Sequence, residues 1–144
     1  MNSQPATEPR AAITDDDYRT LAAFRHALRQ FLTFSEEAAH EGGMTSRQHQ
    51  AILAIRSRAP DPASISDIAA HLMIRHHSAV ELIDRLEKAG LVMRSTSQDD
   101  RRRVLVRLTP RADAVLKELS ATHLAEIIRI RPLLMGLAQR LDRR

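Results

Sequence analysis

Two short arginine-containing stretches carry the residues best suited to bind a polyanion. The segment SQDDRRRVLVRLTP, from Ser97 to Pro110, places two acids and three consecutive arginines at a turn, directly before alternating apolar residues. The segment RHHS, from Arg75 to Ser78, opens a run with helical spacing. A guanidinium suits phosphate oxygens and guanine edges because its planar N–H donors match both. We therefore expect both stretches to contact nucleic acid.

Composition is consistent with that chemistry and narrows the alternatives. The chain has 144 residues, about the length of one domain, and a formal net charge of +4. Arginine supplies nearly all of the positive charge, which favours a nucleic acid partner or reflects a genome-wide preference for arginine codons. The absence of cysteine excludes disulfides, thiolate zinc sites and thiol redox sensing. Because no run of eighteen apolar residues and no signal peptide are visible, we expect a cytoplasmic protein.

The elements that must position these stretches begin with a long helix. Residues 1–13 are polar, contain prolines and lack a period, so we expect a disordered or loosely docked tail. Residues 14–41 are predicted to form a first helix for dimerisation, capped by Thr14 or an early aspartate and ending before Gly42. Its apolar face is predicted to comprise Leu21, Phe24, Leu28, Phe31 and Ser35.

Residues 44–109 show the order of a DNA-binding region. A helix begins near Thr45, where a capping box with Gln48 is expected, and stops before Pro60. In SISDIAAHL we expect Ser66 to cap a short helix. The next helix, about 76–89, is predicted to end at Gly90 in a left-handed conformation. Its buried face is predicted to contain Ala79, Leu82, Ile83 and Leu86. Two short helices joined by a tight turn indicate a helix-turn-helix.

A hairpin and further helices complete the predicted fold. LVMRS and VLVRL alternate like strands, which predicts a hairpin wing at about 91–108 with the arginines at its tip. Residues 110–144 are predicted to form C-terminal dimerisation helices, broken or kinked at Pro132. We therefore expect a mainly α fold with a small β-hairpin (α+β). It is a winged helix-turn-helix whose N- and C-terminal helices form a dimerisation region.

This architecture predicts double-stranded DNA as the partner. The second helix of such a motif enters the major groove, and a basic wing reaches the minor groove or its phosphates. The alternative is that this helix face is merely solvated. A metal site at His76 and His77 is not expected, because neighbouring helical residues diverge by about 100°. The predicted DNA-binding residues are Arg75, His76, His77, Ser78, Glu81, Arg85, Arg94, Asp100, Arg101, Arg102 and Arg103.

The order SISDIAAHL, HHSAVELIDRLEKAGLV, DDRRRVLVRLTP resembles the MarR family of bacterial transcriptional regulators. The resemblance covers nearly the whole chain, from about Asp15 to the final helix. It implies that Arg101 contacts the minor groove and that Asp100 pairs with the guanidinium of Arg102. Two positions depart from the family pattern: Arg75 stands where a small hydroxyl cap is usual, and Ala112 replaces a common glycine.

The resemblance also implies partners. Family members are homodimers, so a pseudo-palindromic operator is expected, with repression as the default outcome. They often respond to small aromatic or anionic effectors bound between the dimer helices and the DNA-binding part. Candidate residues for such a site are Tyr18, Phe24, His26, Arg29 and Phe31, which could equally be dimer core and solvated flank.

Other functions receive less support from the sequence. The seven histidines are scattered without an HExxH or comparable pair, so we expect no enzyme, no cofactor and no metal. His123 lies in an apolar stripe and is predicted to be a hydrogen-bonded interface histidine. Two alternatives stay open: a histidine and carboxylate metal-responsive regulator of the same family, and a winged helix that contacts protein rather than DNA. Steep salt dependence of binding would distinguish DNA from a protein partner.

Overall fold

A computed structural model describes residues 11–143, and the polar tail predicted at 1–13 therefore lies mostly outside the described residues. The elements in chain order are α1 (Asp15–Glu41), α2 (Ser46–Ser57), β1 (Ala63–Ser64), α3 (Ile65–Leu72), α4 (His76–Lys88), β2 (Val92–Thr96), β3 (Val104–Leu108) and α5 (Pro110–Leu141).

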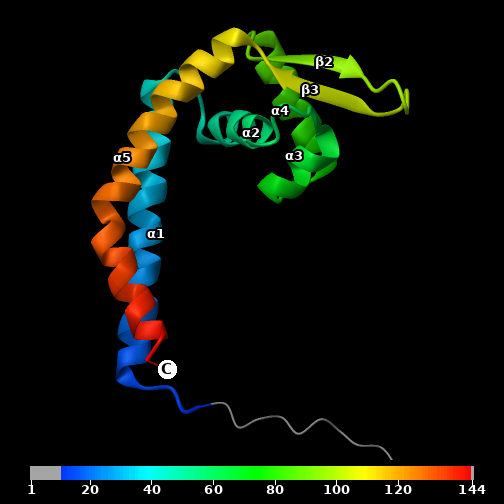
Figure 1. Cartoon of the computed structure of the whole chain (residues 1–144). Helices are drawn as coiled ribbons and strands as arrows, with labels where there is room; N and C mark the ends of the chain where they lie inside the picture. The colour runs from blue at the N-terminus through cyan, green and yellow to red at the C-terminus, as the bar shows by residue number, and fades with distance from the viewer. Residues whose placement is uncertain (1–10, 144) are drawn as a thin grey trace, which may run out of the picture.

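The chain forms two parts, which we call the arm and the lobe (Figure 1). The arm consists of α1 and α5, which run side by side along its length (Figure 1). The lobe consists of α3, α4 and the small sheet. Helix α2 lies between the two parts and packs against both α1 and α5 on one side and α3 on the other. The position of the lobe relative to the arm therefore depends on the packing of α2 and on the first turns of α5, which follow β3 directly and share the core.

The predicted helix start at Thr14 and the predicted capping box at Thr45 are confirmed, and Thr14 also forms a capping box. The Thr14 hydroxyl accepts from the backbone N–H of Asp17, whose carboxylate accepts from the backbone N–H of Thr14. Thr45 and Gln48 repeat the arrangement at α2. Such reciprocal bonds satisfy two of the N–H groups that a helix start leaves unpaired.

The cap of α3 was predicted wrongly. Ser64, not Ser66, is the N-cap, because a capping box needs an acceptor three residues later and Asp67 stands at that distance from Ser64. The helix-turn-helix turn passes through Met73, which adopts a left-handed conformation with φ of 53°. Gly90 has φ of 73°, as predicted for the residue that ends α4, and this conformation suits glycine because it lacks a Cβ.

The sheet has one more strand than the predicted hairpin. Its order is β1-β3-β2, and both pairings are antiparallel. In the wing, Arg94 of β2 stands opposite Val106 of β3. β1 has only two residues, both buried, and sequence periodicity does not reveal so short a strand.

The lobe and α2 share a core of fully buried aliphatic side chains. Its largest members are Ile52, Ile68, Ile83, Leu86 and Val106. The predicted buried face of α4 is confirmed: Ala79, Leu82, Ile83 and Leu86 are all buried. Since these four fix one side of α4, its opposite side must face solvent or a partner.

The arm, in contrast, leaves many apolar side chains exposed. On α1 they are Leu21, Phe24, Leu28 and Leu32, and on α5 they are Leu124, Ile127, Ile128, Leu133, Leu134, Met135 and Leu141. Helix α5 runs unbroken to Leu141, so the predicted break at Pro132 was wrong. Proline removes one backbone N–H donor, and packing of Leu137, which is buried beyond it, favours continuation of the helix. None of the helices in residues 11–143 has the length and apolarity needed to cross a membrane.

Candidate nucleic acid interface

The N-terminal turn of α4 presents the first group of predicted DNA-binding residues. Arg75 is the N-cap, with extended backbone and no capping bond from its side chain. Arg75, His76 and His77 are exposed, and Ser78 is half-buried. The helix start therefore combines unpaired backbone N–H groups, the positive end of the helix dipole and polar side chains. That combination favours a negatively charged partner.

Glu81 and Arg85 lie farther along the same helix. Together with Ser78 they line a surface hollow against the N-terminal turn of α2, which contributes Thr45 and Arg47. Both side chains are exposed. Ser78, Glu81 and Arg85 thus share one face of α4, whereas Arg75, His76 and His77 lie around its N-terminal turn.

The tip of the wing is a compact turn shaped by Ser97 and Asp100. The backbone N–H of Ser97 donates to the carbonyl of Arg103 at 2.9 Å, which closes the loop. The Asp100 carboxylate accepts from the backbone N–H of Arg102 at 3.0 Å. The expected pairing between Asp100 and the guanidinium of Arg102 is therefore not what this structure shows. Asp100 holds the turn, and the side chains of Arg101 and Arg102 project as exposed cations.

Arg94 is placed differently from its prediction as a DNA contact. Its guanidinium reaches from β2 to α4 and forms ion pairs with Asp84 and Glu87. Its side chain is only 26% exposed. Because two carboxylates pair with this guanidinium, Arg94 fixes the wing against α4 and offers little charge to a phosphate.

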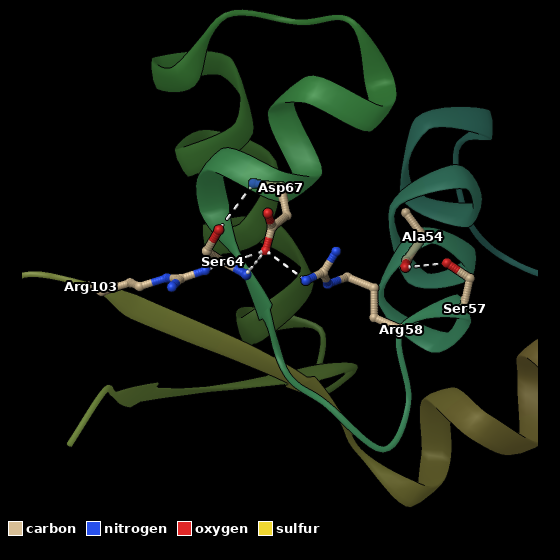
Figure 2. A network of polar contacts seen from close by, with 6 residues as sticks. All are labelled: Ala54, Ser57, Arg58, Ser64, Asp67 and Arg103. Atoms are coloured by element: carbon tan, nitrogen blue, oxygen red, sulfur yellow. Dashed lines mark hydrogen bonds and ion pairs between the residues drawn. The ribbon is translucent and has the colours of Figure 1, made fainter. Parts of the chain in front are cut away.

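Arg103 also belongs to an internal network, which sequence reasoning missed (Figure 2). Asp67, in the first turn of α3, lies 3.4 Å from the guanidinium of Arg58 and 3.8 Å from that of Arg103. Hydrogen bonds from Ser64, opposed in part by burial, together with the two arginines lower the pKa of Asp67. The carboxylate therefore stays charged and links the wing, at the end of its tip loop, to α3 and to the end of α2. No spacing signal could have revealed this network, because Asp67 and Arg103 are far apart in the chain.

The five predicted effector-binding residues do not come together. Phe24 and Phe31 line an apolar pocket between α1 and α5 with Leu28, Ile127, Ile130 and Leu134. His26 and Arg29 line a different pocket, beside Phe34, Glu126 and Arg129. Tyr18 lines neither of these pockets and is 63% exposed near the start of α1.

His123 is hydrogen-bonded, as predicted. Its Nδ1 lies 2.6 Å from the Leu119 carbonyl and its Nε2 lies 2.8 Å from the Ser35 hydroxyl. It is buried within this chain, where α1, α2 and α5 meet, beside His49. Sequence reasoning treated His49 as one of several scattered histidines. Its place on the buried side of α2, one turn before Ile52, was the signal available.

Residues 42–103 match the sequence model of the MarR family. The HTH-type transcriptional regulator YfiV of Bacillus subtilis is 44% identical over 55 residues, which make up 38% of this chain and 34% of the relative. The chain spans about a third to a half of the length of the curated relatives that it matches.

Solved structures resemble a larger share of the chain. AbsC, a MarR family transcriptional regulator from Streptomyces coelicolor, superposes with a TM-score of 0.72 at 21% identity, covering 92% of this chain and 90% of AbsC. A mutant of MepR from Staphylococcus aureus, bound to an oligodeoxyribonucleotide, gives a TM-score of 0.65 at 17% identity, covering 91% of this chain and 98% of that one. At these identities the likeness shows the fold, arm included.

Proposed function

This chain is a member of the MarR family, and from that premise we propose that it is a transcriptional regulator that binds double-stranded DNA sequence-specifically as a homodimer. One observation carries the proposal. The exposed and uncapped start of α4 lies in the same lobe as a wing whose tip presents Arg101 and Arg102. The role is regulatory rather than enzymatic, and its site of action is the cytoplasm, where the chromosome lies.

In this proposal α4 enters the major groove and the wing follows the adjacent backbone. The residues from Arg75 to Ser78 read base edges, with Glu81 and Arg85 farther along the helix. Arg101 and Arg102 neutralise phosphate or occupy a narrow minor groove, where negative potential is strongest. Arg94 and Arg103, held by carboxylates, keep the wing and the helices in register.

The proposed homodimer rests on the arm. Exposed apolar side chains continue along both α1 and α5, with exposed fractions from 38% to 67%. A lone two-helix arm would leave this surface in water at a cost of roughly 25 cal/mol per Å². A second copy that packs α1 and α5 against the first would cover it and would place two α4 helices on one face of a duplex.

We further propose repression as the outcome, relieved by a small anionic or aromatic effector. The pocket beside Phe34 is the more polar of the two: Arg29 and His26 are its candidate anion ligands, beside the carboxylate of Glu37 and the ion pair of Glu126 with Arg129. The apolar pocket at Phe24 and Phe31 suits side chains of the second copy.

Two measurements test the proposal together. Sedimentation equilibrium should give twice the mass of one chain, and fluorescence anisotropy at low salt should show binding to duplexes selected from a random pool. A monomer that binds no duplex at low ionic strength contradicts it. A winged helix that contacts protein instead would show little salt dependence.

A further inference from the structure

Two histidines lie buried against each other where the arm meets α2. His49 of α2 is 3% exposed and His123 of α5 is 9% exposed. Their ring centroids are 4.7 Å apart, with the planes tilted by 34°. Phe31 and Phe34 of α1 pack edge-on against His123, at centroid distances of 6.1 and 5.7 Å. The histidine pair thus lies where three helices meet, with two aromatic rings of α1 against His123.

His123 has hydrogen-bond partners whether neutral or charged. The Leu119 carbonyl can only accept, so Nδ1 carries a proton. In the neutral ring Nε2 accepts from the Ser35 hydroxyl, and in the charged ring it donates to the same oxygen after the hydroxyl turns. A second proton on His123 therefore needs no new partner.

His49 lacks this freedom. Among the described residues, its Nδ1 is buried and has no hydrogen-bond partner. Burial and then the charge of His123 lower the pKa of His49. A charged His49 would bring an additional buried N–H donor without an acceptor, beside a second imidazole. The packed junction therefore requires a neutral His49.

Charged groups around the junction do not supply a counter-ion. Glu37 of α1 and Glu126 and Arg129 of α5 line the surface pocket beside Phe34, and Glu126 is held by Arg129. Glu36 and His40 of α1 line the neighbouring pocket at the α1–α2 corner. On α2 itself, Arg56 forms an ion pair with Asp113 of α5. Within residues 11–143, burial and His123 account for the lowered pKa of His49.

The pair lies at the junction of arm and lobe, so its protonation can change how the lobe is held against DNA. Helix α2 lies between the arm and the lobe (Figure 1). His49 of α2 contacts His123 of α5 in the arm. We propose that the pair His49 and His123 is a proton-operated coupling between arm and lobe, which weakens DNA binding as the pH falls below neutrality. The inference rests on the proposed function.

Charging His49 favours an arrangement in which its ring is hydrated, and that requires α2 to shift from α5. The lobes of a dimer would then hold their α4 helices at a different spacing. Protons and DNA bind opposite arrangements, so each lowers the affinity of the other.

The sign of the pH effect distinguishes this coupling from a direct effect of positive charge at the DNA-facing surface of the lobe. His71, His76 and His77 are exposed on the lobe. Positive charge gained at this exposed surface would strengthen DNA binding, because it adds to the attraction of phosphates. Weaker binding in acid therefore points to the buried pair.

The test compares the parent chain with His49→Phe, which keeps an aromatic ring at the site and removes the titratable group. Anisotropy titrations at constant ionic strength, from about pH 8 to about pH 5.5, would use a duplex selected from a random pool at about pH 7.5. One linked proton per subunit, and so two per dimer, changes the affinity of the dimer for DNA by at most about a hundredfold per pH unit. We expect the Kd of the parent to rise at least about fivefold over this range, and the Kd of His49→Phe to stay level or fall.

Parallel pH profiles for parent and His49→Phe, or tighter binding of the parent in acid, overturn the coupling while leaving the proposed function intact. Absence of duplex binding at every pH overturns both. If His49→Phe does not fold, NMR titration of the parent's imidazole signals replaces it. We expect the pKa of His49 to lie below the ordinary value for a histidine, and a pKa at or above that value rejects the inference.

Discussion

Replacement of Arg101 by alanine tests the DNA-facing wing. Its side chain is exposed at the tip, and in residues 11–143 it takes part in none of the ion pairs that hold Arg58, Arg94 and Arg103. Its charge is therefore available to phosphate, and its removal should leave the fold unchanged. The same substitution occurs in both wings of a dimer.

The expected magnitude follows from counterion release. Each lost phosphate contact lowers the slope of log affinity against log salt by about 0.9, so two wings lower it by about 1.8. When the salt concentration rises fourfold, the variant should therefore lose about twelvefold less affinity than the parent loses. The assay is fluorescence anisotropy of a labelled duplex at several salt concentrations.

Arg107→Ala is the matched control, because it removes the same charge from the same hairpin. Arg107 donates to the Pro60 carbonyl at 2.8 Å, at the end of β3 that lies away from the tip. For Arg107→Ala, the slope of log affinity against log salt should stay within about 0.5 of the parent value. Equal slopes for Arg101→Ala and the parent, or equal changes for both variants, would refute a wing that contacts DNA through its tip.

Four further changes probe other parts of the structure. Arg94→Gln removes the link between β2 and α4, so the preference for a selected duplex over a random one should fall about tenfold with little change in salt slope; an unaltered preference contradicts the positioning role. Asp67→Asn frees Arg58 and Arg103 from the carboxylate that holds them. The slope of log affinity against log salt should therefore steepen by about one or more, and non-specific binding to DNA should tighten. Ser64→Ala, which keeps the carboxylate, serves as its control and should leave the slope unchanged. Because the folded chain lowers the pKa of His49, the unfolded chain takes up more protons as pH falls through about 6.5; urea denaturation should therefore show a smaller free energy of unfolding in acid, and His49→Phe should lessen that decrease. Leu28→Glu places a charge in the apolar pocket of the arm, and sedimentation should show monomers. A retained dimer would show that this pocket is not part of the dimer interface.

Local rules predicted most of the helical fold correctly. Capping boxes at Thr14 and Thr45 and the left-handed Gly90 use interactions within a few residues, so their signals lie in short stretches of sequence. The buried face of α4 follows from periodicity alone. Local rules did not predict that α5 is unbroken. Contacts with α1 compensate for the backbone N–H donor that Pro132 lacks.

The candidate site was predicted by residue type but not by role. Three wing arginines and Arg94 are chemically alike in the sequence, yet carboxylates from other elements engage two of them. Asp84, Glu87 and Asp67 make that difference, and only the folded chain brings them near the wing. For the same reason the orphaned nitrogen of His49 could not be predicted.

Hydroxyl-radical and methylation footprinting of the parent chain on a selected duplex tests the central proposal most directly. Two α4 helices of a homodimer should protect two major-groove segments about 10 base pairs apart, flanked by minor-groove protection from the wings. A single protected patch, or a duplex left fully reactive at saturating protein, would contradict a homodimer that contacts DNA through the α4 helix and the wing of each copy.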